Sequence, residues 1–179
     1  MITLNRRDSR TDGAIKAVDV DPLNLPDGFV PTVARAKNYA VARDEDEPLI
    51  EMLLKAVVQG VERYTHRLLV RRSVEVMARP GRIQLPYGPH PDVQLVEERS
   101  IAADGTVQWD EVDASKYEQT GLLIAVRAGN VVRVTYEAGD QAPMGMRVPI
   151  LQDVAHAYDN RSGSGVTISK TAYDQWVIV

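Results

Sequence analysis

The longest regular alternation of apolar and polar positions in the chain runs from Asp44 to Leu68. Apolar side chains recur at intervals of three and four residues, which gathers them in one stripe on a helix of 3.6 residues per turn. These positions are Leu49, Ile50, Leu53, Leu54, Val57, Val58, Val61, Tyr64 and Leu68. The opposite face carries Glu51, Lys55, Gln59, Glu62, Arg63 and Arg67. The pattern predicts a long amphipathic helix, residues 46–67, that buries one face in its own subunit.

The sequence also predicts where this helix begins. Four acidic residues, 44–47, suit the positive end of the helix dipole, and Asp46 is the expected cap. Pro48 must lie in the first turn, because a proline further in would remove a backbone hydrogen bond. Glu51 precedes Lys55 by four residues, the order that favours an ion pair along a helix.

A shorter helix, residues 32–41, is expected before the long one, with Thr32 as its cap. Near residue 69 the apolar period changes to two, which is typical of strands. Residues of about 69–137 are therefore predicted to form a run of short antiparallel strands.

Turn residues divide this run. Ala103–Thr106 is the turn of one hairpin. Gly129–Asn130 is expected to form a second hairpin that joins Leu122–Val126 to Val131–Tyr136. The prolines of residues 86–91 cannot join a sheet ladder and predict an irregular loop.

A last helix is expected at residues 148–160. Val148, Leu151, Val154, Ala155 and Tyr158 would share its buried face, and Pro149 would fit only in its first turn. Residues 139–145 before it are expected to be a loop. The fold class is therefore α+β: a long amphipathic helix and a C-terminal helix packed on a small antiparallel sheet, in a core of residues 31–161.

The two ends of the chain differ from this core. Residues 1–30 show no sustained period, carry a locally basic start and are rich in Pro, Asp and Gly, so we expect an extended N-terminal arm. Residues 162–179 begin with a Ser-Gly sequence typical of a flexible linker. The apolar side chains behind it are costly to leave in water. They either fold back on their own domain or dock on a partner, and they are Val166, Ile168, Tyr173, Trp176, Val177, Ile178 and Val179.

Composition narrows the classes of function. The chain has 179 residues, of which 44% are hydrophobic and 26% charged, an ordinary globular composition. A net charge of −4 argues against a protein whose main task is to neutralise phosphates. The absence of cysteine excludes disulfides, thiolate catalysis and cysteine-zinc sites. No apolar run approaches the ~18 residues of a membrane span, and the N-terminus lacks the apolar segment of a signal peptide.

Candidate chemistry is sparse. The three histidines, His66, His90 and His156, lie far apart and match no metal-binding spacing. The sequence contains no glycine-rich phosphate loop, no nucleophile elbow and no nucleophile–base pair that spacing could support. Nothing in these patterns favours an enzyme, and we expect no cofactor and no metal.

Five segments of the sequence, taken in order, resemble segments of a known protein family. They are DEPLIEMLLKAVVQGVERYTHRLL at 46–69, the LP…P…V spacing at 85–93, ADGT at 103–106 with Tyr117 after it, VRVTYEAG at 132–139 and VPILQDVAHAYDNR at 148–161. Together they resemble the head-to-tail connector (adaptor) proteins of long-tailed bacteriophages and of phage-like gene transfer agents. The resemblance covers about residues 33–161 and leaves both ends outside the common core.

The resemblance implies a structural virion protein without enzymatic activity. It implies a homo-oligomeric ring of twelve subunits, bound beneath the portal protein, that extends the DNA channel and presents a surface to the next stopper or tail component. Double-stranded DNA would pass through the lumen without sequence-specific binding, which the acidic net charge suits. The protein would be assembled in the host cytoplasm and would reside at the head–tail interface, with no membrane partner.

Three sets of residues are candidates for contacts in such an assembly. The polar face of the long helix is a candidate interface between subunits, through Glu51, Lys55, Glu62 and Arg63. The apolar tail, residues 166–179, is expected to grip the portal. The proline loop is a candidate contact on the channel or on the tail-side partner, through Tyr87, His90 and Asp92.

Two other classes of function stay open. Another connector-layer protein, a stopper or a tail terminator, would share the ring and contact different neighbours. A small cytosolic enzyme or ligand-binding domain would instead be a monomer or dimer with a deep pocket of convergent polar groups.

Overall fold

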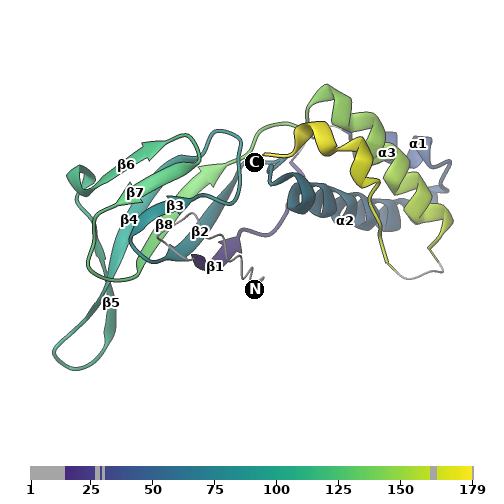
Figure 1. Ribbon diagram of the computed structural model, residues 1–179. Coiled ribbons are helices and arrows are strands. Elements are labelled where there is room, and N and C mark those ends of the chain that lie inside the picture. Colours follow the sequence, from purple (N-terminus) through teal and green to yellow (C-terminus); the bar gives the residue numbers. More distant parts are fainter. Residues whose placement is uncertain (1–14, 27–28, 30, 162–164, 179) are drawn as a thin grey trace. The chain divides into compact units, whose positions relative to one another are not determined.

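The computed structural model describes residues 15–26, 29, 31–161 and 165–178. The chain divides into two compact units, one made of Met1–Asp21 with Arg71–Gly139 and the other of Pro22–Val70 with Asp140–Val179. The first unit holds strands and the second holds the α-helices (Figure 1). The α+β class predicted from the sequence is confirmed.

The larger sheet of the strand unit has five antiparallel strands in the order β1-β2-β8-β4-β5. These strands are β1 Ile15–Val20, β2 Arg72–Ala78, β4 Asp92–Ile101, β5 Val107–Glu111 and β8 Val132–Ala138. Residues 15–20 belong to the segment expected to be an extended arm, and here they pair with β2 as an edge strand. Residues 1–14 lie outside the described residues.

The smaller sheet has three antiparallel strands in the order β3-β7-β6, and it forms a second layer beside the larger one (Figure 1). Its strands are β3 Gly81–Gln84, β6 Tyr117–Thr120 and β7 Leu123–Val126. The hairpin expected at Gly129–Asn130 was wrong, because β7 and β8 belong to different sheets. The hairpin partner of β7 is β6, across Gly121, whose φ of 59° suits a glycine.

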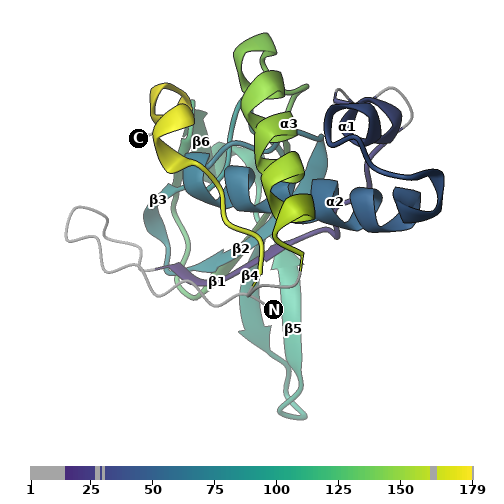
Figure 2. The ribbon, with the colours of Figure 1, turned by 90° about the vertical axis from the view of Figure 1, so that its right-hand side faces the viewer.

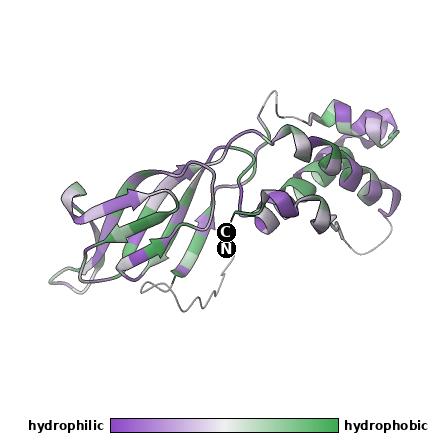
Figure 3. Ribbon diagram, turned by 45° about the horizontal axis from the view of Figure 1, so that its top comes forward, coloured by the Kyte–Doolittle hydropathy of each residue, from purple (hydrophilic) through white to green (hydrophobic). Residues whose placement is uncertain are grey.

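The strands of the two sheets carry both hydrophobic and hydrophilic residues, as Figure 3 shows by colour. In β2 and β8 the buried positions are every second residue, which is the period-two pattern that predicted these strands. Tyr136 on β8 is fully buried, and its hydroxyl accepts a hydrogen bond of 3.2 Å from the Tyr87 backbone N–H. Burial raises the pKa of Tyr136 well above its usual range.

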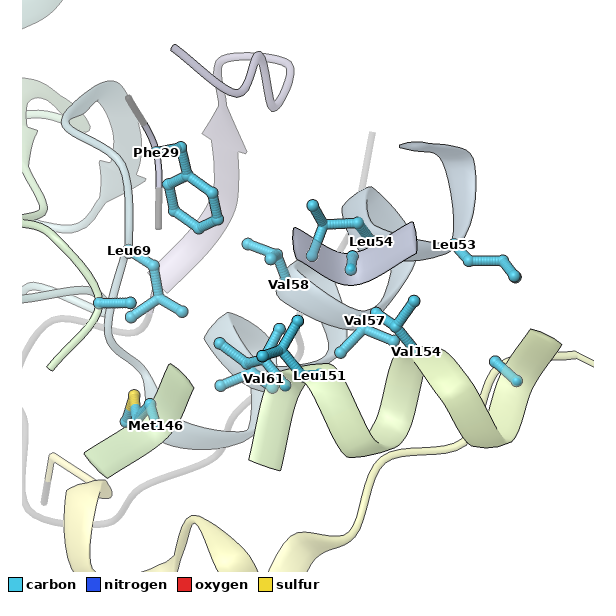
Figure 4. Close-up of a cluster of buried hydrophobic side chains, with 14 of the residues drawn as sticks. Phe29, Leu53, Leu54, Val57, Val58, Val61, Leu69, Met146, Leu151 and Val154 are labelled. Carbon is cyan, nitrogen blue, oxygen red and sulfur yellow. The ribbon is translucent and has the colours of Figure 1, made fainter. Parts of the chain in front are cut away.

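The second unit is built on three helices, α1 Val33–Tyr39, α2 Glu47–Thr65 and α3 Met144–Asp159 (Figure 2). One hydrophobic cluster fills the space between them, with Leu53, Leu54, Val57, Val58 and Val61 of α2 against Met146, Leu151 and Val154 of α3 (Figure 4). The apolar stripe predicted on α2 is therefore the centre of this core. The described residues of the cluster all come from the helical unit and none from a strand.

The predicted start of α2 is partly right. A short 3-10 turn, η1 Asp44–Asp46, leads into the helix, and Pro48 lies in its first turn as expected. Asp46 occupies the cap position, but its side chain makes no capping hydrogen bond. Its carboxylate accepts a hydrogen bond from the Tyr158 hydroxyl at the far end of α3 instead, so α2 and α3 run in opposite senses. Thr32 does cap α1, through a bond of 3.2 Å from the Arg35 N–H.

Helix α3 differs from its prediction. It begins at Met144, four residues before the predicted start at Val148, so Pro149 lies inside the helix and the expectation that it fits only in the first turn was wrong. Val148, expected on the buried face, is 49% exposed. The glycines and prolines of residues 139–149 have low helix propensity, which suggested a loop. Burial of Met146 and Ile150 offsets this low propensity and stabilises the helix.

Candidate interaction surfaces

The described residues offer no metal centre, because they contain no group of His, Cys, Asp or Glu side chains that could hold an ion. Within the same residues, none of the helices is both long enough and apolar enough to cross a membrane. The residues predicted to make contacts lie in the C-terminal segment, on α2 and in the proline loop.

The C-terminal segment, residues 165–178, folds back on its own helical unit, the first of the two fates that its composition allowed. It contains two short turns, η3 Lys170–Ala172 and η4 Asp174–Trp176. The Ile178 N–H donates a hydrogen bond of 2.9 Å to the Thr65 carbonyl at the end of α2. Figure 2 shows this segment, in yellow, beside α2 and α3.

Two glycines on the helices make room for this segment. A Cβ atom on Gly60 of α2 would lie 3.0 Å from the Ile168 side chain. A Cβ atom on Gly145 of α3 would lie 2.9 Å from the Trp176 ring, closer than real Cβ atoms come. A side chain at either position would require the C-terminal segment to shift, so the segment packs closely on both helices.

A buried carboxylate, Asp153 of α3, fixes the middle of the segment. It accepts hydrogen bonds from the Ser169 N–H at 3.1 and 3.2 Å, from the Ser169 hydroxyl at 2.8 Å and from the Tyr173 hydroxyl at 2.8 Å. Asp153 and Tyr173 are 3% and 0% exposed. Burial and the hydrogen bond to Asp153 raise the pKa of Tyr173 far above its ordinary value.

This arrangement changes what can be expected of the tail. Tyr173 is buried in its own subunit, and Val166, Ile168 and Trp176 pack against the helical core. Val177 and Ile178 are half-buried, and Val179 lies outside the described residues. A role of this segment in portal binding remains a prediction. The segment would have to bind the portal through its outer side, or be released from α2 and α3 first.

The polar face of α2 holds three of the four predicted interface residues. Glu51 and Lys55 form an ion pair of 2.7 Å on the helix surface, and Arg63 is exposed. Glu62 departs from the prediction because it is 4% exposed. Its carboxylate accepts a 2.8 Å hydrogen bond from the Leu69 N–H, which satisfies the backbone just after the helix.

An ion-pair cluster joins α1 to the start of α2. The Lys37 ammonium lies 2.8 Å from Asp44 and 2.9 Å from Glu47. These two hydrogen bonds, the one to Asp44 first, raise the pKa of Lys37 to about 12. The acidic run that the sequence assigned to the helix dipole therefore also binds α1.

The three predicted contact residues of the proline loop differ in exposure. Tyr87 is 7% exposed and takes part in the interior of the strand unit, so it is not available to a partner. His90 and Asp92 are exposed, and Asp92 accepts a hydrogen bond of 2.8 Å from Gln94 and lies 3.5 Å from the Arg71 guanidinium. His90 and Asp92 thus remain candidates for a contact.

The β4–β5 hairpin extends past the larger sheet (Figure 1). The pairs Ser100–Gln108 and Ile101–Val107 belong to β4 and β5 only, whereas the pairing of β4 with β8 ends at Glu98. Ile101 and Val107 are 68% and 50% exposed, so the hairpin ends in an apolar cross-strand pair.

The hairpin is held at its base. The Arg133 guanidinium of β8 lies 2.7 Å from the Glu97 carboxylate and 4.5 Å from the centre of the Trp109 ring. These contacts tie β4 and β5 to the middle of the sheet.

Several exposed apolar side chains of the helical unit were not predicted from the sequence. Met144 is 78% exposed, Met52 58% and Val41 87%, and the Tyr39 side chain is also largely exposed. The signal for Met52 was present in the sequence, since it lies opposite the apolar stripe of α2 among polar residues. Met144 could not be assigned to a helix face, because the helix was expected to begin after it.

Comparison with known proteins gives one kind of match. No protein-family profile matches the sequence, and no curated protein sequence matches it either. Solved structures share the fold, and two of them are described here. One is a chain in the neck of an empty gene transfer agent particle computed with C6 symmetry, with 15% identity, a TM-score of 0.66 and coverage of 91% of this chain and 96% of that chain. The other is a chain in the virion of a native gene transfer agent particle, with 16% identity, a TM-score of 0.63 and coverage of 90% and 95%. At this identity the likeness shows the fold, which extends over both units of the chain.

Proposed function

We propose that this chain is a structural protein of the neck of a phage-like particle. The likeness in fold carries the proposal, because a chain of such a neck is covered over 96% of its length and no large part of either protein is left over. The five sequence segments that resemble those of the adaptor proteins support the proposal independently, because that resemblance rests on the amino-acid sequence and not on the fold.

Within the neck we propose the role of head-to-tail adaptor. Copies of the chain would form a ring beneath the portal protein, extend the DNA channel and bind the next connector or tail component. A ring of twelve is compatible with the sixfold symmetry used for the neck of the similar structure, because twelve is a multiple of six. The net charge of −4 supports a channel wall that DNA passes without being held.

The test is assembly from separate components. The purified chain would be mixed with portal-bearing heads that lack a neck and, in parallel, with isolated tails, and each mixture would be imaged by electron cryomicroscopy. We expect added density in the form of a ring at the portal vertex and none on isolated tails. A ring found only on tails would instead indicate a tail terminator, and a ring that forms only after another protein has bound the portal would indicate a stopper.

A further inference from the structure

The two edges of the larger sheet differ in whether they can accept another strand. β1 forms one edge and β5 the other (Figure 1). β1 has a register shift near its start, which disturbs the regular spacing of its backbone groups. The Asp21 N–H donates to the Ser73 carbonyl of β2, so the preceding Val20 N–H points out of the sheet. There it donates to the Asp19 carboxylate at 3.0 Å. Bulges and side-chain caps of this kind protect an edge against further pairing.

The β5 edge has no such protection. All five residues of β5 pair with β4 without a register shift, and none of them is proline or lysine. Hydrogen bonds from the Ala102 N–H to the Thr106 carbonyl and from the Val112 N–H to the Val96 carbonyl fix the phase of the ladder. Backbone groups of an antiparallel strand alternate between its two sides, so every second residue of β5 presents its N–H and C=O to the free edge. These residues are Val107, Trp109 and Glu111.

The side chains of these three residues share one face of the sheet. Val107 is 50% exposed and Trp109 is half-buried. Glu111 stands directly opposite Glu97 of β4, and like charges in such a pair weaken it. The Arg133 guanidinium neutralises Glu97 at 2.7 Å, whereas Glu111 is exposed and forms no ion pair within the described residues. A strand that fits this edge therefore has two apolar residues and then a basic one, at alternate positions.

The first residues of the chain, which lie outside the described residues, have this sequence pattern. Ile2, Leu4 and Arg6 follow one another with a period of two. In a parallel alignment they face the three β5 residues in order, with aliphatic against valine, aliphatic against tryptophan and arginine against glutamate. An antiparallel alignment centred on the tryptophan would instead place Arg6 on Val107 and Ile2 on Glu111.

We propose that residues 2–6 of one copy add as a parallel strand to the β5 edge of the neighbouring copy. Backbone hydrogen bonds would supply the affinity, and the three facing side-chain pairs would set the register. The match in charge favours this occupant, because β5 has two carboxylates and no basic residue, while the first ten residues contain three arginines and one aspartate.

The β5 edge of the same copy is a poor acceptor for this segment. β1 and the added strand would be five strand spacings apart, about 24 Å. The chain from residue 6 to Ile15 reaches only about 30 Å when fully extended. Crossing the sheet would therefore leave about two residues for the turns at both ends and for passing over the side chains of the sheet.

The position of the segment and of its acceptor gives the contact its symmetry. The segment leads into β1 at one edge of the sheet, and the acceptor is the opposite edge. Each copy thus donates one strand and accepts one, which is a heterologous contact that closes into a ring when the rotation allows it. The inference rests on the proposed ring and identifies a link between its neighbouring copies.

A disulfide between copies tests the register. The chain has no cysteine, so a disulfide can form only where cysteines are introduced. Thr3 should stand opposite Gln108, which is exposed on β5, at a distance that a disulfide can span. A tagged chain with Thr3→Cys would be mixed with an untagged chain with Gln108→Cys, assembled on portal-bearing heads and oxidised. The matched control uses Thr120→Cys, which is exposed on β6 at an edge of the smaller sheet.

We expect a disulfide-linked pair of one tagged and one untagged chain with Gln108→Cys, and at least about tenfold less of it with Thr120→Cys, because a disulfide requires the two residues to lie opposite each other. Since each chain carries a single cysteine, a segment that folds on its own sheet would give no linked pair.

An exchange of charges tests the contact between Arg6 and Glu111. Arg6→Glu or Glu111→Arg alone should lower the yield of rings on heads about tenfold or more, because like charges would then face each other at every contact. The double variant should restore the yield, since the pair is then only reversed. Glu118→Arg, an exposed change on β6, is the control and should assemble as the wild type does. Glu111 is also exposed, so its variant should match the wild type in thermal unfolding.

Several results would overturn the inference. Rings whose mixed chains form no linked pair would show that the β5 edge is free or is occupied by the portal or the next connector. Equal linking through Thr120→Cys would show contact without register. Normal yield from both single charge variants, or loss without rescue in the double variant, would show that Arg6 and Glu111 do not face each other. A wild-type chain that forms no ring would overturn the proposed function itself, and oxidation of the mixed chains in solution would then test the pairing separately.

Discussion

Replacement of Tyr173 by phenylalanine removes one hydroxyl group from the interior of the helical unit. That hydroxyl donates to the Asp153 carboxylate at 2.8 Å, and both residues are almost completely buried. A hydrogen bond to a charged group contributes about 1.5–3 kcal/mol, and its loss inside a protein is not repaired by water. Ser169 continues to donate to Asp153, so the carboxylate keeps part of its hydrogen bonding. We expect Tyr173→Phe to lower the free energy of unfolding of the helical unit by about 1.5–3 kcal/mol.

The chain provides its own probe and its own control. It contains two tryptophans, and Trp109→Phe leaves Trp176, which packs on Gly145, as the fluorescent reporter of the helical unit. The control is Tyr64→Phe, which removes a hydroxyl that donates to the exposed Asp174. Water can replace that bond, so the expected loss is about 0.5 kcal/mol or less.

Both variants would be unfolded in urea in the Trp109→Phe background, and the free energies compared at the same temperature. The reasoning is refuted if Tyr173→Phe costs no more than Tyr64→Phe. That result would mean that the C-terminal segment is not held at Asp153 in solution.

Further predictions concern the same unit. Gly145→Ala should destabilise it by about 1–3 kcal/mol through overpacking, and less when Trp176→Ala is also present, which a double-mutant cycle in urea would reveal. Glu62→Ala should lower the free energy of unfolding by about 1–3 kcal/mol, because a buried backbone N–H loses its acceptor. The control Glu51→Ala should change it by no more than about 0.5 kcal/mol. Equal effects of the two variants in denaturant unfolding would contradict the burial of Glu62. Above pH 10 the unfolded chain ionises Tyr173 while the folded chain keeps it protonated, so stability should fall with rising pH, and Tyr173→Phe should reduce that slope in pH-dependent unfolding.

The helices and strands were predicted correctly where the apolar periodicity extends over many residues. The stripe of α2 required no knowledge of its surroundings, because its apolar residues repeat over five turns and any compact fold must bury them. The strands β2 and β8 were found for the same reason, since period two brings their apolar residues to one face. The start of α3 was predicted wrongly, because Gly145 and Pro149 disfavour a helix that only tertiary burial makes stable.

The candidate sites show a similar division. Glu51, Lys55 and Arg63 lie on the surface as the helical period predicts, but Glu62 is turned into the structure by the backbone that follows the helix. The period places Glu62 near the edge of the polar face, where a small rotation decides between water and core. No spacing rule could show that the Leu69 N–H would need its carboxylate.

The sequence by itself determined that this chain has a long amphipathic helix, an α+β composition and an apolar C-terminal segment that must be covered. Only the tertiary structure decided what covers it. Local periodicity fixes which side of an element is apolar, because that depends on neighbours within a few residues. The partner of that side depends on groups far apart in sequence: Gly60 and Gly145 leave the space and Asp153 accepts the hydrogen bonds that hold the segment on its own helices.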